Sequence, residues 1–365
     1  NTRKPEVSYG DSLQGDLGRR DFTINAMAVS LPSQTFVDPF GGLHDLSVGV
    51  IRTPGQAEDS FNDDPLRMMR AARFASKLGF EVAGDVVEAM TKLAERITIV
   101  SAERVRDELS KLLLTSDPKA GVELLVDTGL ASHVLPEVPA LKLEIDEHHH
   151  HKDVYEHSLQ VLEQAIGLEP TGPDLTLRLA ALLHDIGKPA TRRFERGGGV
   201  SFHHHEVVGA RMAAKRLKAL RYPREVVSDV ARLVELHLRF HGYAEGEWTD
   251  SAVRRYVRDA GPLLARLHRL TRADCTTRNR RKATSLSRAY DSLEQRIDQL
   301  AQQEELAMIR PDLDGNEIML VLDIAPGRVV GQAYAYLLER RLDRGPVEKD
   351  VAAQELRDWW AAREG

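Results

Sequence analysis

A carboxylate and three arginines recur at every third position along one segment, DDPLRMMRAARF, which begins at Asp63. The Asp64-Pro65 pair is typical of a helix start, because Asp accepts hydrogen bonds from free amides and Pro tolerates the first turn. On a helix, this spacing places four charged side chains on one face: Asp64, Arg67, Arg70 and Arg73. The apolar residues between them then point toward a core. The segment therefore predicts an amphipathic helix whose charged face fits a nucleoside triphosphate.

The chemistry of this face selects two of the bases. Asp64 can accept a hydrogen bond from the exocyclic amine of cytosine or adenine, while Arg67 donates to the ring acceptor beside it. Uracil has a carbonyl where the amine would be, and a buried unpaired polar group costs about 1–3 kcal/mol. Arg70 and Arg73 lie one or two turns further on and carry a fixed charge for phosphates. The alternative interpretation is a capped amphipathic helix with a solvated arginine face.

Three further motifs accompany this helix in a defined order. RRDFTINAMA begins at Arg19, DPFGG at Asp38 and SAERVRDEL at Ser101. Together with DDPLRMMRAARFASKLGF, they resemble the bacterial class II CCA tRNA nucleotidyltransferases. The resemblance covers residues 1 to about 135.

The resemblance assigns nucleotide-binding roles residue by residue. It implies that the incoming nucleotide is contacted by Arg20, Asp64, Arg67, Arg70 and Arg73, of which Asp64 and Arg67 read the base. Asp63 stands where the family commonly has Glu. Because its side chain is shorter, we do not assign Asp63 a role in reading the base. The family's Mg²⁺ site is a GGxxRD loop and a DxD strand, both upstream of RRDFTINAMA. The eighteen residues before Arg19 contain neither, so we expect the Mg²⁺ ligands upstream of residue 1 and name no catalytic residue for nucleotidyl transfer.

The middle of the chain carries a second set of potential ligands. Imidazole and carboxylate groups occur there in the order His, His-Asp, His, His, Asp: His157, His184, Asp185, His205, His237 and Asp274. Such groups suit a divalent transition metal, which can activate water or polarise a phosphoryl oxygen. With the surrounding HDIGKP sequence, the set resembles the HD superfamily of metal-dependent phosphohydrolases. A structural hydrogen-bond cluster is the alternative.

Two positions in this set have competing candidates. His205 is preferred over His203 and His204, because it stands before a Gly-Ala pair that lets helices approach closely. His237 could instead be His241. Both alternatives stay open at this level.

Composition limits where nucleic acid can bind. The formal net charge of the 365 residues is −6, which argues against indiscriminate nucleic-acid binding, so an RNA surface must be local. Two basic clusters fit phosphate contacts that position RNA without reading its sequence. The candidates are Arg211, Lys215, Arg216 and Lys218 in the first cluster, and Arg278, Arg280, Arg281 and Lys282 in the second. Solvated helix faces balanced by acids elsewhere are the alternative.

The order of these landmarks predicts a mainly α protein that includes the remnant of a mixed α/β nucleotidyltransferase head. Strands are expected near Ile24–Leu31 and Thr35–Asp38. Four parts follow along the chain: the C-terminal part of the head (1–55), a helical neck and body for base recognition and tRNA binding (56–145), an HD domain (146–290) and a helical tail that binds tRNA (291–365).

The resemblance implies template-independent addition of CCA to tRNA 3′ ends from CTP and ATP, with an accessory HD phosphohydrolase activity. The partners are then tRNA, CTP and ATP, and no obligate protein partner is indicated. We expect a cytoplasmic protein, because no apolar run reaches membrane-spanning length and the single Cys275 suits a reducing compartment. The alternatives are a bacterial poly(A) polymerase, or a stand-alone HD nucleotidase or phosphodiesterase with a vestigial nucleotide-binding head. Enzymes that add only CC or only A share these motifs.

Overall fold

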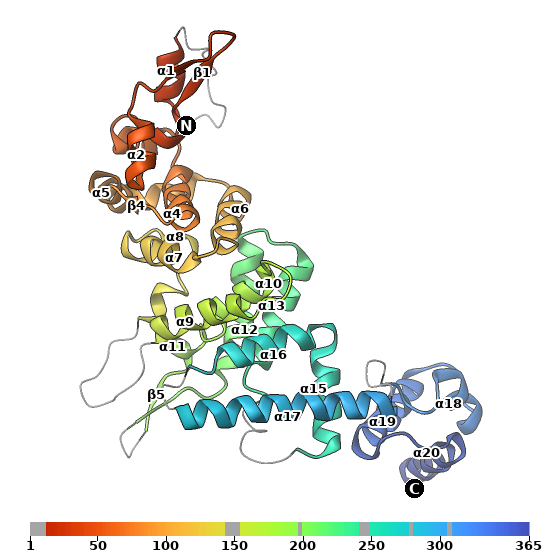
Figure 1. Ribbon diagram of the computed structural model, residues 1–365. Helices are drawn as coiled ribbons and strands as arrows, with labels where there is room; N and C mark the ends of the chain where they lie inside the picture. The colour runs from red at the N-terminus through yellow and green to blue at the C-terminus, as the bar shows by residue number, and fades with distance from the viewer. Residues whose placement is uncertain are drawn as a thin grey trace. The chain divides into compact units, whose positions relative to one another are not determined.

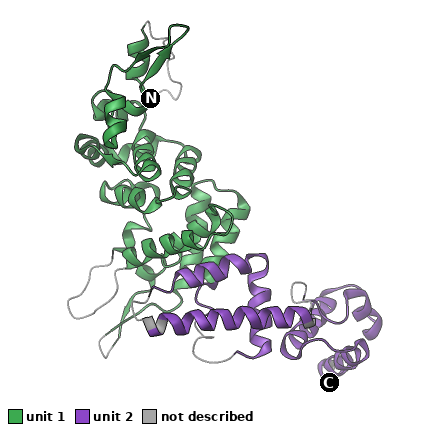
Figure 2. Ribbon diagram, in the orientation of Figure 1, with its two compact units in different colours: residues 1–235 green, residues 236–365 purple. Residues whose placement is uncertain are grey.

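The computed structural model describes residues 12–142, 154–195, 199–240, 248–276, 280–304 and 309–364. It is 69% helical and its strands are two or three residues long, which confirms the expected mainly α fold. The chain divides into two compact units, residues 1–235 and 236–365 (Figure 2). The four parts expected along the chain stay a prediction, since this division falls within the third of them.

The first unit begins with the small mixed region labelled near the N-terminus in Figure 1. Its elements are α1 (Leu13–Gly18), η1 (Thr23–Asn25), β1 (Ala28–Ser30), β2 (Thr35–Val37), α2 (Gly42–Val48) and β3 (Val50–Ile51). β1 and β2 pair antiparallel, with Ala28 opposite Val37. The strand expected from residue 24 begins later because the preceding residues form a 3-10 turn. The Thr23 hydroxyl there donates to the buried Asp45 at 2.7 Å.

A helical region follows and surrounds α4. Its elements are α3 (Ala57–Asp63), α4 (Leu66–Leu78), β4 (Glu81–Val82), α5 (Gly84–Leu93), η2 (Ala94–Ile99), α6 (Ala102–Leu113), α7 (Pro118–Asp127), α8 (Ala131–Val134) and η3 (Pro139–Leu141). α4 packs against both α6 and α7. A side chain at Gly121 of α7 would lie 2.8 Å from the Ala72 carbonyl, so glycine permits the close approach of α7 to α4. Asp64 accepts from the Leu66 amide at 3.2 Å, at the helix start where the sequence places it.

The rest of the first unit is a bundle built around a fully buried helix. Its elements are α9 (Val154–Gly167), α10 (Leu175–Leu183), α11 (Lys188–Thr191), β5 (Arg193–Phe194), β6 (Val200–Ser201), α12 (His205–Ala219) and α13 (Arg224–Leu236). α10 is apolar on nearly every side and buried from Thr176 to Leu183, as expected for a helix without a solvent face. α9 packs along it, so the first HD-type histidine on α9 is brought beside the C-terminal end of α10.

The second unit consists of helices. Its elements are α15 (Asp250–Ala260), η4 (Gly261–Leu263), α16 (Leu264–Ala273), α17 (Arg280–Glu304), α18 (Gly315–Leu322), α19 (Arg328–Arg344) and α20 (Lys349–Glu364). A small core centred on Ile318, Leu337 and Leu356 joins the last three helices. Arg254 of α15 is buried and donates to the Leu342 carbonyl of α19 at 3.2 Å. No helix in the described part of the chain is long and apolar enough to cross a bilayer.

Candidate nucleotide and metal sites

Of the two residues expected to read the base, Asp64 lies just before α4 and Arg67 lies on its first turn, and they have separate partners. Arg67 donates from Nη1 to the Ser60 hydroxyl at 2.8 Å and from Nη2 to the Arg19 carbonyl at 2.5 Å. The Asp64 carboxylate accepts from Arg104 of α6 at 2.8 Å. The side chains of Asp64 and Arg104 are 31% and 53% exposed, so this ion pair faces solvent and is worth little on its own.

The next two arginines of the stripe are bound by buried carboxylates. Arg70 Nε donates to Asp21 Oδ2 at 2.8 Å, and Arg73 Nε donates to Glu108 Oε2 at 2.6 Å. Asp21 and Glu108 are 8% and 3% exposed. These pairs tie α4 to the RRDFTINAMA segment and to α6. Arg70 keeps 32% of its side chain exposed against 12% for Arg73, so Arg70 is better placed to share its charge with a phosphate.

Sequence reasoning missed Arg104, Asp21 and Glu108, although all three stand in the motifs that it quotes. For Glu108, however, the helical pattern of the sequence was informative. It occupies the buried stripe of α6 together with Val105, Leu109 and Leu112, where a helical pattern calls for an apolar residue. An acid at such a position needs a buried cation, which Arg73 supplies.

Arg20, the remaining nucleotide candidate, lies just beyond the C-terminal cap of α1. Its side chain is 54% exposed, and its guanidinium donates to Asp16 at 3.3 Å. A long, exposed pair of this kind is easily exchanged for another acceptor. The geometry leaves Arg20 accessible to a ligand, and its role stays a prediction.

Within the first unit, α9, α10 and α12 bring four of the predicted metal ligands together. His184 Nε2 lies 3.2 Å from Asp185 Oδ2 and 3.3 Å from His157 Nε2. His205 Nε2 lies 3.2 Å from Asp185 Oδ1, on the other side of the carboxylate. His157, His184 and Asp185 place one ligand atom each within 4.8 Å of one another, which is a group that could hold a metal ion.

Backbone carbonyls orient two of these imidazoles. Nδ1 of His184 donates to the Ala181 carbonyl, and Nδ1 of His205 donates to the Phe202 carbonyl, both at 2.8 Å. Because Nδ1 of each ring is bound to a carbonyl, Nε2 is the nitrogen that faces Asp185 in both residues. A metal ion bound at these Nε2 atoms would take the place of the protons that face Asp185.

Asp185 carries a charge at the centre of this cluster. Its burial by itself would raise the pKa of the carboxyl, but the His184 charge and hydrogen bonds from His184 and His205 outweigh that effect. Lys188 adds a further contribution, with Nζ at 2.6 Å from Oδ2. The pKa of Asp185 is therefore held well below its usual range, and the group is an anionic ligand. Lys188 was not among the sequence candidates, although the HDIGKP motif contains it.

The three histidines at 203–205 differ sharply in their surroundings. The side chain of His204 is 84% exposed and that of His205 is 9% exposed, while His203 lies on the surface. The geometry thus favours His205 as the ligand, as the sequence preferred. His237 and Asp274 belong to the second unit, so their coordination of the same ion stays a prediction, and His241 lies outside the described residues.

The first basic cluster separates into exposed and bound cations. Arg211, Lys215 and Lys218 are exposed on α12. Arg216 instead donates to Glu137 at 2.9 Å and is 23% exposed, so its charge is already matched by an acid of the protein.

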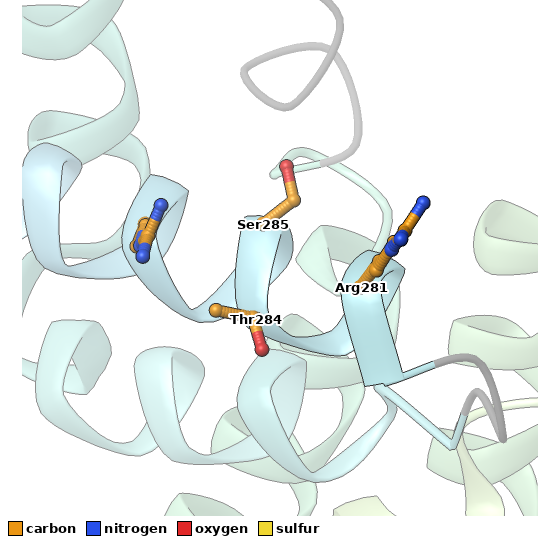
Figure 3. A pocket seen from close by; sticks show the side chains of 4 residues that line it. Arg281, Thr284 and Ser285 are labelled. Carbon is orange, nitrogen blue, oxygen red and sulfur yellow. The ribbon is translucent and has the colours of Figure 1, made fainter.

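The structure describes only part of the second basic cluster. Arg278 lies outside the described residues, as do the side chains of Arg280 and Lys282. Arg281 is exposed on α17, beside Thr284 and Ser285, which project from the next turn (Figure 3). These residues and Arg288 line an open depression of about 420 Å³.

A close backbone contact sets the position of His205, and we expect Gly187→Ala to disturb it. A Cβ at Gly187 would lie 2.1 Å from the His205 carbonyl oxygen and 2.7 Å from the Gly209 amide. Because both atoms are backbone, α12 must move away and carry His205 with it. We expect a loss of stability of about 1–3 kcal/mol and a metal affinity lower by roughly 10–100-fold, measured by metal titration. Gly167→Ala, where a Cβ meets nothing within 4 Å, is the control and retains wild-type affinity.

Comparison with known proteins places the chain in a family. Three family models match the chain: "Poly A polymerase head domain" over residues 1–52, "Probable RNA and SrmB- binding site of polymerase A" over 79–141, and "HD domain" over 154–279. The chain is 36% identical over 342 residues to the A-adding tRNA nucleotidyltransferase of Deinococcus radiodurans, a match that covers 92% of this chain and 76% of that protein. It is 34% identical over 360 residues to the CC-adding tRNA nucleotidyltransferase of Thermus thermophilus, covering 96% and 79%.

A further relative matches over a shorter part of its length, and a solved structure shares the fold. The chain is 37% identical over 235 residues to the multifunctional CCA protein of Neisseria gonorrhoeae and spans 55% of that protein. The crystal structure of the Bacillus stearothermophilus CCA-adding enzyme in complex with CTP has a similar fold, with a TM-score of 0.66 at 23% identity over 98% of this chain and 77% of that one.

The fold and the two sites define a nucleotidyltransferase-type helical body joined to an HD domain. The chain belongs to the family of tRNA nucleotidyltransferases and poly(A) polymerases, which confirms the resemblance that its motifs indicated.

Proposed function

We propose that this protein is a tRNA nucleotidyltransferase that extends tRNA 3′ ends with nucleotides of the CCA sequence, using CTP and ATP and no nucleic-acid template. The observation that carries the proposal is the α4 face, where Asp64 and Arg67 stand one turn apart at the surface. The names of the relatives support it, since they specify A addition, CC addition and a multifunctional CCA protein. The protein acts in the cytoplasm, where tRNA and nucleotides meet.

The base is recognised when it replaces a protein side chain as the hydrogen-bond partner of Asp64. The exposed Asp64–Arg104 pair contributes little free energy, so the exocyclic amine of cytosine or adenine can replace Arg104 as the donor to Asp64. Ser60 and the Arg19 carbonyl hold the Arg67 guanidinium in place, which leaves its remaining N–H groups for the ring acceptor. Arg20 and Arg70 contribute positive charge for the triphosphate, and Arg73 fixes the helix against α6.

Phosphoryl transfer of this kind depends on Mg²⁺, which neutralises charge on the phosphates and the attacking oxygen. The carboxylates that bind it in the family belong to the GGxxRD and DxD motifs, which the eighteen residues before Arg19 do not contain. We therefore assign none of the described residues to this ion. The work of the described residues is to bind the nucleotide and select its base.

We expect Asp64→Ala or Arg67→Ala in the full-length protein to relax selection of CTP and ATP over UTP and GTP. Each change removes one side of the hydrogen-bond match, which is worth about 1–3 kcal/mol of discrimination. Single-nucleotide incorporation rates for all four triphosphates measure this. Asp63→Ala, an exposed acid next to the site, is the matched control and keeps wild-type selectivity. An equal loss of rate for all four nucleotides would show that Asp64 and Arg67 do not read the base.

One incorporation assay tests the proposed function as a whole. Full-length protein is given tRNA that lacks its 3′ end, with each nucleotide alone and with CTP and ATP together. Addition of C, A or both, stopping at the CCA end, supports the proposal and identifies which nucleotides are added. Long homopolymeric A tails would instead identify a poly(A) polymerase, and no extension by any nucleotide would overturn the proposal.

The cluster around Asp185 favours a second activity, metal-dependent hydrolysis of a phosphomonoester or a 2′,3′-cyclic phosphate. His157, His184, Asp185 and His205 would hold a divalent transition metal such as Ni²⁺, Mn²⁺ or Co²⁺, with His237 and Asp274 as further proposed ligands. Two Nε2 atoms oriented toward one ionised carboxylate fit such an ion, whose binding would release the Nε2 protons. When bound, the metal polarises a phosphoryl oxygen and activates water. The protein's own residues orient the ligands, and Lys188 adds a positive charge beside the carboxylate.

A further inference from the structure

Helices α12 and α13 line an open groove of about 540 Å³, and none of the metal-cluster residues lines it. Its lining includes the small side chains of Ala210, Ala214 and Ala231. Its cationic lining residues are Arg211 and Lys218 from α12, and Arg224 and Arg232 from α13. The groove also lies outside residues 79–141, which match the family's RNA-binding model.

Most of the charge in this groove is not matched by acids. Arg232 pairs with Glu235 at 2.7 Å, and Glu235 is the one acid in the lining. Arg211, Lys218 and Arg224 are exposed, and their side chains form no ion pair with the described residues. Three like charges around one groove repel one another and attract an anion. Because the chain as a whole carries −6, this is a local positive field on an acidic protein.

The groove and the metal cluster lie on opposite faces of α12. Val207, Ala210, Arg211, Ala214 and Lys218 follow the spacing of a single helical stripe. His205 stands two residues before Val207, which turns its side chain about 200° away from that stripe. The groove is therefore not part of the cleft in which a phosphoester would meet the metal.

We propose that this groove binds the phosphate backbone of the tRNA, an inference that rests on the proposed function. From Val207 to Lys218 the helix rises about 16 Å, and nucleic acid presents several phosphates over such a length. The small alanine side chains in the lining let a sugar-phosphate chain approach closely, while the basic side chains contact phosphates without reading bases. Arg216 takes no part, because its side chain is on the opposite side of α12 and is bound to Glu137.

The test uses full-length protein and tRNA that lacks its 3′ end. We expect Arg211→Gln/Lys218→Gln/Arg224→Gln to weaken tRNA binding by on the order of tenfold or more at low salt, and to reduce the slope of log affinity against log salt by about 3. Each single substitution reduces the slope by about 1. Arg193→Gln, an exposed cation on β5 outside both basic clusters, is the matched single control and leaves the slope unchanged. Arg211→Lys/Arg224→Lys keeps the charge and retains affinity.

The outcomes separate this proposal from the function on which it rests. Circular dichroism establishes that the triple variant is folded. A folded triple variant with wild-type affinity and salt slope, in a protein that does extend tRNA, overturns the groove proposal alone. A wild-type protein that neither binds nor extends tRNA overturns both. Loss of affinity with an unchanged salt slope also contradicts the proposal, because phosphate contacts must release counterions.

Discussion

Asp185→Asn is expected to abolish metal binding by the HD-type cluster and, with it, phosphoester hydrolysis. The carboxylate is almost fully buried and lies 3.2 Å from Nε2 of both His184 and His205. Asparagine keeps the shape but removes the charge that attracts a divalent cation. Loss of an outer hydrogen-bond partner already costs roughly 10–100-fold in metal affinity, so loss of the central ligand should cost at least about 100-fold. Metal content after dialysis against Mn²⁺, Ni²⁺ or Co²⁺, and hydrolysis across a phosphoester panel, measure the two effects.

His204→Ala provides the matched control for this prediction. His204 is next to a proposed ligand in sequence, but its side chain is 84% exposed, so metal content and hydrolysis should stay at the wild-type level. Nucleotide binding by α4 should also survive Asp185→Asn, because the two sites use separate residues and separate helices. If the wild-type protein takes up no metal and hydrolyses no phosphoester, the cluster is a structural hydrogen-bond network.

The face of α4 shows what a sequence pattern can and cannot specify. The spacing of Asp64, Arg67, Arg70 and Arg73 predicts a helix with one charged side, and the helix forms as expected. The spacing carries no information about partners, because those come from segments distant in sequence. Ion pairs with Asp21 and Glu108 become visible when α4 packs against α6 and the RRDFTINAMA segment. Residue spacing thus predicts the charged side of α4. Packing against other segments determines which of those charges remain available to a ligand.

The metal cluster was more predictable because its ligands are tied to helix ends. His184 and Asp185 follow a long apolar run, which predicts a buried helix that ends in polar residues. Their burial and their mutual distances fit a metal site. Sequence reasoning could not supply the backbone carbonyls that orient the imidazoles, because Ala181 and Phe202 contribute through their main chain.

Local hydrogen bonding also explains the strand that was expected from residue 24. The apolar run from Ile24 to Leu31 has the composition of a strand, and β1 forms from Ala28. At its start, Thr23 donates to Asp45, and the chain turns into a 3-10 helix instead. Side-chain bonds from Thr to a distant acid override β-propensity, and composition alone does not reveal them.

Arg178→Met is expected to be the most destabilising single change on α10. Arg178 is 2% exposed, pairs with the buried Glu169 at 2.7 Å, and donates to the carbonyls of Leu113 and Thr115 at 2.6 Å. These bonds fix α10, which carries the His184-Asp185 pair, to the C-terminal end of α6. Methionine fills a similar volume but leaves Glu169 as an uncompensated buried charge. Breaking a buried pair in this way costs about 3–5 kcal/mol.

The destabilisation caused by Arg178→Met should be confined to the first unit, and two separate probes can test this. All three tryptophans, Trp248, Trp359 and Trp360, lie in the second unit, so urea unfolding followed by their fluorescence reports on that unit. Hydrogen exchange of α10 peptides, read by mass spectrometry, reports on the first. We expect Arg178→Met to accelerate exchange in α10 and to leave the fluorescence transition unchanged.

Two further variants separate the buried charge from the loss of side-chain contacts. Arg178→Met/Glu169→Gln removes the unpaired charge yet keeps an acceptor for the Asp174 amide, which bonds to Glu169 at 2.8 Å, so it should recover part of the lost stability. Lys92→Met breaks an ion pair with Glu58 whose side chains are 63% and 50% exposed, and it should cost less than about 1 kcal/mol. If Arg178→Met exchanges no faster than Lys92→Met, the buried ion pair does not hold α10 in place, and the position of the HD-type pair must depend on apolar packing alone.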